Sequence, residues 1–275
     1  MTQQQIGFIG GGNMASSLIG GLVSNGYPAE KITVSDLDAE KRTYLSDTFG
    51  VTALEDSAGV AALADILVLA VKPQVMQSVA ISISEPVQKK KPVVVSIAAG
   101  IRVDALERWL GEGLAVVRCM PNTPALVKTG ATGLYANAQV DDNQKDQVES
   151  LLRAVGVTVW VSSENDLDAV TALSGSGPAY FFMVMEALEE AAIAAGLDPK
   201  VAQLLTQETA LGSAKMALES SESAGVLRQR VTSPGGTTER AIGILEEKGL
   251  KDTFHQAILA AKQRSVELSD ELGKS

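Results

Sequence analysis

A glycine-rich turn follows a short apolar run near the start of the chain, in residues 6–15, Ile-Gly-Phe-Ile-Gly-Gly-Gly-Asn-Met-Ala. The spacing Gly10-x-Gly12-x-x-Ala15 matches the fingerprint of a strand–turn–helix unit that binds the pyrophosphate of a dinucleotide. The first glycine permits a tight turn, the second lets the backbone approach the pyrophosphate, and the helix N-terminus offers N–H groups to the anion. This pattern predicts a cofactor site that includes Gly10, Gly12, Asn13 and Met14.

An acidic residue ends the next apolar run, in the pair Ser35-Asp36. An acid at this place usually accepts hydrogen bonds from the adenosine ribose, which favours NAD, and it repels a 2′-phosphate. Lys41 and Arg42 follow on the expected helix and could offset that repulsion. The alternative is that Asp36 or Asp38 only caps the helix.

Two further segments end apolar runs and therefore face the same crevice, since the carboxyl ends of parallel strands line it. The first is Ala70-Val71-Lys72-Pro73, in which Pro73 suits the first turn of a helix. The second contains Ala98-Ala99-Gly100, whose small side chains leave room for a ribose or a nicotinamide. Lys72 is expected near the cofactor and in catalysis, although an ordinary solvated lysine is the alternative.

Three more segments are candidates for the substrate. Residues 118–124, Arg-Cys-Met-Pro-Asn-Thr-Pro, form a turn that two prolines make rigid. Residues 174–180, Ser-Gly-Ser-Gly-Pro-Ala-Tyr, follow Thr171. Residues 231–239, Val-Thr-Ser-Pro-Gly-Gly-Thr-Thr-Glu, form a glycine-rich turn that enters a helix, and the backbone N–H groups of such a turn suit a carboxylate. A plain helix–helix connection with a threonine cap is the alternative for the last segment.

These segments must be positioned by two different kinds of domain. Up to about residue 161, apolar runs alternate with amphipathic stretches, and runs that are apolar throughout suit a parallel sheet buried on both faces. After residue 167, Ala, Leu, Glu and Gln dominate at helical spacing. We predict a doubly wound α/β domain over residues 1–163 and an all-α domain over 164–275. The expected strands are Gln5–Ile9, Ile32–Ser35, Ile66–Val71, Pro92–Ile97, Ala115–Met120 and Val157–Val161, with Thr132–Tyr135 as a candidate; the expected helices are Met14–Ser24, Ala39–Phe49, Ala58–Ala64, Val75–Ser82, Val103–Leu110 and Asp142–Ala154.

One predicted helix, Ala179–Ala195, is almost entirely apolar and carries only Glu186, Glu189 and Glu190 as charges. A helix of this kind belongs in a core or between subunits. Because a helical domain of this size is small for burying it alone, we favour a subunit interface.

Composition excludes several function classes. Lys and Arg number 23 and Asp and Glu number 33, which gives a net charge of −10, unlike a protein that neutralises phosphates of nucleic acid. One cysteine, Cys119, and one histidine, His255, cannot form a Cys/His zinc site or an intramolecular disulfide. We expect no bound metal and no imidazole chemistry. The uncharged stretch Met1–Ala29 lacks the basic start of a signal peptide and is rich in glycine, so we predict a cytoplasmic protein without a membrane segment.

Taken together, five motifs resemble the Δ1-pyrroline-5-carboxylate reductase family in order and spacing over nearly the whole chain. They are Gly-Gly-Gly-Asn-Met at 10–14, Ala-Val-Lys-Pro at 70–73, Met-Pro-Asn-Thr-Pro at 120–124, Ser-Gly-Ser-Gly-Pro-Ala-Tyr at 174–180 and Ser-Pro-Gly-Gly-Thr-Thr at 233–238. The resemblance implies a Rossmann-like N-terminal domain and an all-α C-terminal dimerisation domain. It also implies homodimers that often assemble into decamers, and an active site shared between a cofactor domain and the partner's helices.

The activity that this resemblance implies is reduction of a cyclic imine, pyrroline-5-carboxylate, to L-proline with NADPH, or with NADH. Thr171 would then lie near the imine nitrogen, and we expect it to act in catalysis together with Lys72. The substrate-binding residues would be Met120, Asn122, Thr123, Ser233, Gly235, Gly236, Thr237 and Thr238. Asp36 fits less well, since many NADPH-using relatives carry no acid there, and this leaves the choice between NADPH and NADH open.

Two other classes compete with this interpretation. Hydroxyacid and 6-phosphogluconate-type dehydrogenases typically need a catalytic lysine on the helix that links their domains, but residues 167–177 contain none. A nicotinamide-sensing or assembly protein would not need the intact glycine-rich loop at 233–238.

Overall fold

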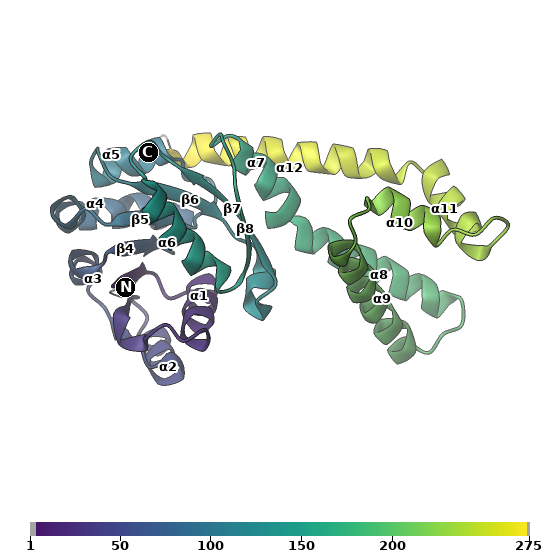
Figure 1. Ribbon diagram of the computed structural model, residues 1–275, viewed down its shortest axis with the longest axis horizontal. Helices are drawn as coiled ribbons and strands as arrows, with labels where there is room; N and C mark the ends of the chain where they lie inside the picture. Colours follow the sequence, from purple (N-terminus) through teal and green to yellow (C-terminus); the bar gives the residue numbers. More distant parts are fainter. Residues whose placement is uncertain (1–3, 274–275) are drawn as a thin grey trace. The chain divides into compact units, whose positions relative to one another are not determined.

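The computed structural model describes residues 4–273, which divide into two compact units. We call them the sheet unit, residues 4–176 and 260–273, and the helical unit, Gly177–Leu259. The last helix of the chain begins in the helical unit and ends in the sheet unit. Figure 1 labels helices and strands of both units.

The sheet unit is built on one sheet of eight strands in the order β3-β2-β1-β4-β5-β6-β7-β8. All neighbouring strands are parallel except β6 and β7, which are antiparallel. The reversal of strand order beside β1 is that of a doubly wound sheet and confirms the predicted fold class. The strands are β1 (Ile6–Ile9), β2 (Ile32–Ser35), β3 (Thr52–Leu54), β4 (Ile66–Leu69), β5 (Val93–Ser96), β6 (Val116–Met120), β7 (Gly130–Ala136) and β8 (Gly156–Trp160).

Helices cover both faces of this sheet (Figure 1). One core joins the strands to α1, α2 and α6, and a second core joins them to α3, α4 and α5. Adjacent residues of a strand point into opposite cores, so Phe8 lies in the first and Ile9 in the second. The helices of this unit are α1 (Asn13–Ser24), α2 (Ala39–Phe49), α3 (Ser57–Leu63), α4 (Pro73–Lys90), α5 (Val103–Leu110), α6 (Asp142–Arg153) and α7 (Asp166–Val170), with 3₁₀ turns at Ala29–Lys31 and Thr123–Val127.

The helix boundaries follow from local chemistry. The Asp38 side chain caps α2 by accepting hydrogen bonds from the N–H groups of Glu40 and Lys41, and Gly50 ends that helix with φ of 70°. Asp141 and Gln144 form a capping box at the start of α6. The expectation that Asp38 caps a helix is therefore confirmed, which leaves Asp36 to be explained separately.

Three features differ from the sequence expectations. Strand β3 was not predicted, because its three residues have no buried apolar run. Helix α4 is longer than predicted and reaches Lys90 with Pro86 inside it. Residues 164–176 and 260–273 belong to the sheet unit rather than to the helical unit, because helical propensity does not reveal against which core a helix packs.

The helical unit contains α8 (Gly177–Ala194), α9 (Pro199–Glu219), α10 (Ala224–Arg230), α11 (Thr237–Glu247) and the first part of α12 (Leu250–Gly273). Its buried residues are few: Gly177, Ala202 and Thr206. Apolar side chains of α8 and α9 are exposed instead. They are Phe181, Phe182, Met183, Val184, Leu188 and Ile193 on α8, and Val201, Leu204, Leu205, Leu211, Met216 and Leu218 on α9. Among the described residues, we find no helix whose length and apolar character would let it cross a membrane.

Candidate active site

The glycine-rich turn between β1 and α1 has one closed side and one open side. Gly10 has φ of 100°, and a Cβ atom there would lie 2.7 Å from the carbonyl oxygen of Ala70. A Cβ on Gly11 would lie 2.6 Å from Leu45 Cδ1, whereas a Cβ on Gly12 would meet no atom within 4 Å. The open space over Gly12, beside the exposed Asn13 and the half-buried Met14 at the start of α1, fits the approach of a pyrophosphate.

The Asp36 side chain is hydrogen bonded to this turn. Its Oδ2 accepts a hydrogen bond from the Gly11 N–H at 2.8 Å, and its Oδ1 accepts one from the Asp38 N–H at 2.9 Å. Lys41 Nζ lies 3.9 Å from Asp36 Oδ2, and Arg42 donates to the Asp36 carbonyl oxygen at 2.8 Å. The buried hydroxyl of Ser35 lies 3.0 Å from that of Ser57.

The segment Ala70–Pro73 borders the same turn, since Val71 Cγ1 would lie 3.0 Å from a Cβ on Gly10. Lys72 precedes α4 and is exposed, and Pro73 occupies the first turn of that helix as expected. After the end of β5, Ala98 and Gly100 are buried and Ala99 is half-buried. Gly100 has φ of 74°, and a Cβ there would lie 3.0 Å from Leu272 Cδ1, so the last turns of α12 pack against this loop.

The carboxyl end of β6 is tied to the segment after α7. Asn122 Nδ2 donates to the Ser174 carbonyl oxygen at 3.1 Å, and Asn122 Oδ1 accepts from the Ala131 N–H at 2.8 Å. A Cβ on Gly175 would lie 2.6 Å from Met120 Cε. The structure therefore brings the predicted residues Met120 and Asn122, with the exposed Thr123 beside them, to the segment that contains Thr171.

Thr171 begins a π-helical turn, Thr171–Gly175, in which the Ser176 N–H donates to the Thr171 carbonyl oxygen at 2.8 Å. Turns of this kind are rare and frequently lie at functional sites. The Thr171 hydroxyl donates to the Leu167 carbonyl oxygen at 2.7 Å. Because its proton is engaged there, the half-buried hydroxyl oxygen presents acceptor capacity.

A buried ionic network beside Thr171 was missed by the sequence reasoning. Asp168 is only 1% exposed, and its carboxylate accepts from Ser265 Oγ at 2.7 Å and from Arg102 Nη2 at 3.2 Å. Nearby, the buried Arg118 donates to Glu164 Oε1 at 3.0 Å. No sequence signal pairs these residues, because Asp168 and Ser265 are 97 positions apart and meet only through folding.

The second candidate anion loop, Ser233–Thr238, lies in the helical unit. Gly235 turns the chain with φ of 72°, and the Gly236 N–H donates to the Ser233 carbonyl oxygen at 3.0 Å. The Gly235 N–H donates to Glu239 Oε2 at 2.7 Å, so this loop already holds a carboxylate. The N–H groups of Thr237 and Thr238 start α11, where the first helical N–H groups have no intrahelical acceptor.

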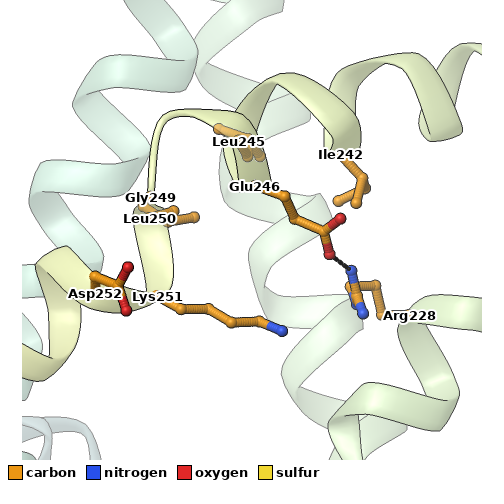
Figure 2. Close-up of a pocket in the computed structure, with 8 residues that line it drawn as sticks. All are labelled: Arg228, Ile242, Leu245, Glu246, Gly249, Leu250, Lys251 and Asp252. Atoms are coloured by element: carbon orange, nitrogen blue, oxygen red, sulfur yellow. Dashed lines mark hydrogen bonds and ion pairs between the residues drawn. The ribbon is translucent and has the colours of Figure 1, made fainter.

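A separate hollow of about 370 Å³ lies within the helical unit (Figure 2). On its walls Arg228 Nη1 lies 2.6 Å from Glu246 Oε1, so two of the lining charges neutralise each other. None of the predicted site residues lines it, so we do not assign it to the candidate active site. The lining residues are Arg228, Ile242, Leu245, Glu246, Gly249, Leu250, Lys251 and Asp252.

The single cysteine and the single histidine lie in different units of the chain. Cys119 is buried on β6, and burial raises the pKa of its thiol far above the usual range, which keeps the thiol protonated. His255 is exposed on α12.

The sheet and its open glycine-rich turn define the class: a Rossmann-type oxidoreductase that uses NAD(P)H. Residues 5–100 match the family described as "NADP oxidoreductase coenzyme F420-dependent". Solved dehydrogenases of lower identity share only the fold, such as prephenate dehydrogenase from Aquifex aeolicus at 17% identity and a TM-score of 0.55.

The particular family follows from closer relatives. Residues 164–268 match the family described as "Pyrroline-5-carboxylate reductase dimerisation". The chain is 50% identical over 274 residues to the pyrroline-5-carboxylate reductase of Pseudomonas aeruginosa, covering 100% of both chains, and 40% identical to that of Escherichia coli, covering 99% of this chain and 100% of the relative. The chain therefore belongs to the pyrroline-5-carboxylate reductase family.

Solved structures agree with this membership. A pyrroline-5-carboxylate reductase from Coxiella burnetii superposes with a TM-score of 0.94 at 47% identity, covering 98% of this chain and 99% of that one. The Plasmodium falciparum enzyme, solved with NADP bound, superposes with a TM-score of 0.86 at 29% identity, again covering 98% and 99%.

Proposed function

We propose that this protein reduces pyrroline-5-carboxylate to L-proline with NADPH or NADH, the last step of proline synthesis. The observation that carries the proposal is the pairing, in one family member, of an open dinucleotide turn with a loop that already binds a carboxylate. The bound nicotinamide supplies the hydride. The protein orients the cofactor and the substrate and supplies charged groups beside them.

We propose Gly10, Gly12, Asn13, Met14, Ser35, Asp36, Ala70, Val71, Lys72, Pro73, Ala98, Ala99 and Gly100 as the residues that hold the cofactor. Gly12 leaves space where the pyrophosphate must come close. Lys72 adds a positive charge at the carboxyl end of β4, where it attracts anionic ligands and supports catalysis.

Thr171 is proposed to orient the substrate nitrogen. A protonated imine is the better hydride acceptor, and its N–H needs an acceptor. The Thr171 oxygen meets that need because its own proton is donated to Leu167. Met120, Asn122 and Thr123 form the adjacent wall. The substrate proton can come from water, so no histidine is required.

The substrate carboxylate is proposed to bind the Ser233–Thr238 loop. The N–H groups of Gly235 and Gly236 are engaged within the loop, so these glycines shape the turn. Donors for the substrate remain at the start of α11: the N–H groups and hydroxyls of Thr237 and Thr238, with the hydroxyl of Ser233. Holding the ring at its nitrogen and its carboxylate presents one face for reduction.

We also propose that the chain functions as a homodimer, in which the helical unit of one subunit completes the site of its partner, and that dimers assemble further into a decamer. The exposed apolar faces of α8 and α9 support a large interface. A cytoplasmic location is proposed because a single cysteine suits a reducing compartment.

Steady-state oxidation of NADPH and NADH, with and without pyrroline-5-carboxylate, tests this function. Thr171→Val removes the hydroxyl at nearly constant volume, and we expect kcat to fall by about 10- to 100-fold. Thr238→Val should mainly raise KM for pyrroline-5-carboxylate.

The matched control is Thr253→Val, since the Thr253 hydroxyl makes the same kind of bond, to the carbonyl oxygen of Gly249 at 3.1 Å, on an exposed face of α12. Its kinetics should match the unmodified enzyme. Unchanged turnover in both Thr171→Val and Thr238→Val would show that the site is assigned wrongly.

A further inference from the structure

The acid at the end of β2 does not point into the open part of the cofactor crevice. Both carboxylate oxygens of Asp36 accept hydrogen bonds from backbone N–H groups, from Gly11 at 2.8 Å and from Asp38 at 2.9 Å. The side chain is only 14% exposed. The carboxylate thus joins the glycine-rich turn to the start of α2.

The two sides of the turn separate the roles of its glycines. On the closed side, a Cβ on Gly11 would lie 2.6 Å from Leu45 Cδ1, and Asp36 Oδ2 would lie 3.4 Å from it. On the open side, Gly12 has free space. Asp36 therefore supports the turn from behind, on the side away from the place where the pyrophosphate approaches.

The charge of Asp36 is also compensated. Lys41 Nζ lies 3.9 Å from Asp36 Oδ2 and 3.9 Å from Asp38 Oδ2, and this lysine is half exposed. The Arg42 guanidinium is held on the carbonyl oxygens of Asp36 and Leu37 and lies 3.5 Å from Glu55. Near β2 the cations Lys41 and Arg42 lie among the carboxylates of Asp36, Asp38 and Glu55, so the negative charge of Asp36 is partly offset.

We propose that Asp36 is a positioning residue for the phosphate-binding turn and does not select NADH over NADPH, and that Lys41 partly offsets the charge of Asp36 so that a cofactor with a 2′-phosphate is accepted. This inference deepens the proposed function and rests on cofactor use by that enzyme. An acid at this position usually selects for NAD, whereas here we assign Asp36 to support of the turn.

The test measures the Kd of NADPH and of NADH separately, from the fluorescence of the reduced nicotinamide, without substrate. With Asp36→Ala, we expect both cofactors to bind about tenfold more weakly, because the turn loses an acceptor for its Gly11 N–H. The ratio of the two Kd values should change by less than about fivefold, because the charge change is of the same size as in Lys41→Gln. Asp36→Asn keeps one acceptor oxygen, so it should weaken both cofactors less, with a similar limit on the ratio.

Lys41→Gln should weaken NADPH selectively by about threefold to fivefold, since only NADPH carries the additional phosphate. The matched control is Lys145→Gln, which makes the same charge change on α6, where Lys145 pairs with the exposed Asp142. It should leave both Kd values unchanged.

An Asp36 variant that binds NADPH more tightly and NADH more weakly, with the ratio shifted by about tenfold or more, would overturn the inference. A Lys41→Gln variant that weakens the binding of both cofactors equally would also overturn the inference. This outcome counts even if the Asp36 variants do not fold. Binding of both cofactors without turnover of pyrroline-5-carboxylate would instead contradict the proposed function and leave this inference standing.

Discussion

The sheet unit and the helical unit differ in how they bury apolar surface. In the sheet unit, two continuous cores fill both faces of the sheet. In the helical unit, Gly177, Ala202 and Thr206 are the buried positions among its described residues, and the apolar side chains of α8 and α9 are exposed. The first unit buries most of its apolar side chains within itself, and the second leaves many of them exposed.

This contrast has a functional meaning. A cofactor turn needs atoms held within a few tenths of an ångström, and a close-packed sheet provides such support. The helical unit carries the Ser233–Thr238 loop, which we propose binds the substrate carboxylate, and the stability of this unit is expected to depend on a second subunit. Cofactor binding and substrate binding should therefore respond differently to loss of the dimer.

The largest effect is expected from a charge on the exposed face of α8. Phe182 is 66% exposed, and Phe182→Glu should cost about 2–4 kcal/mol at the proposed interface. We expect monomers by light scattering and loss of pyrroline-5-carboxylate turnover, with NADPH binding retained. Leu63→Glu, at an exposed leucine on α3, is the control and should stay dimeric and active. A dimeric and active Phe182→Glu variant would remove the proposed role of this face.

A smaller effect is expected inside the sheet unit, at the network that fastens its C-terminal helix. Asp168→Ala leaves Arg102 and Ser265 without their shared acceptor, and we expect a loss of about 3 kcal/mol. For a chain of this size, this lowers Tm by about 8 °C. Differential scanning calorimetry provides the measurement.

The control for this variant is Asp270→Ala, which removes an exposed carboxylate from the same C-terminal helix. Its Tm should stay close to that of the unmodified protein. Equal Tm values for the two variants would show that the Asp168 network does not hold the end of α12 on the sheet unit.

The smallest effect concerns a surface pair of the sheet unit. Burial tends to raise the pKa of Asp65, but the Lys90 ammonium at 2.7 Å and the Gln5 N–H at 3.0 Å outweigh it, so the pKa lies below its usual range. The ionised form is thus favoured in the folded state, and the stabilisation is present above about pH 4 and lost as pH falls through the lowered pKa.

Because both side chains of this pair are more than a third exposed, solvent screens the interaction, and it is worth at most about 1 kcal/mol. Asp65→Asn should therefore be slightly less stable than the unmodified protein at pH 7, by urea unfolding, and the difference should shrink at pH 3. A difference that grows toward pH 3 would contradict the sign of this pKa shift.

Much of the fold was predictable from the chain. The strands β1, β2, β4, β5, β6 and β8, the candidate strand now seen as β7, and the helices α1 to α6 were expected from apolar runs and amphipathic spacing. Strand β3 was not, because its exposed three-residue segment has no distinguishing pattern. The candidate residues of the glycine-rich turn were identified by spacing alone, although their roles remain predictions.

What the sequence by itself determined was local: which segments form strands and helices, where glycine must turn the chain, and to which family the motifs point. Tertiary structure decided what depends on distant groups meeting. It turned Asp36 toward the Gly11 N–H, joined Asp168 to Ser265, and returned the end of α12 to the sheet unit. The physical reason is that apolar periodicity depends only on residues close together in the sequence, whereas a hydrogen bond between distant residues exists only after the chain has folded.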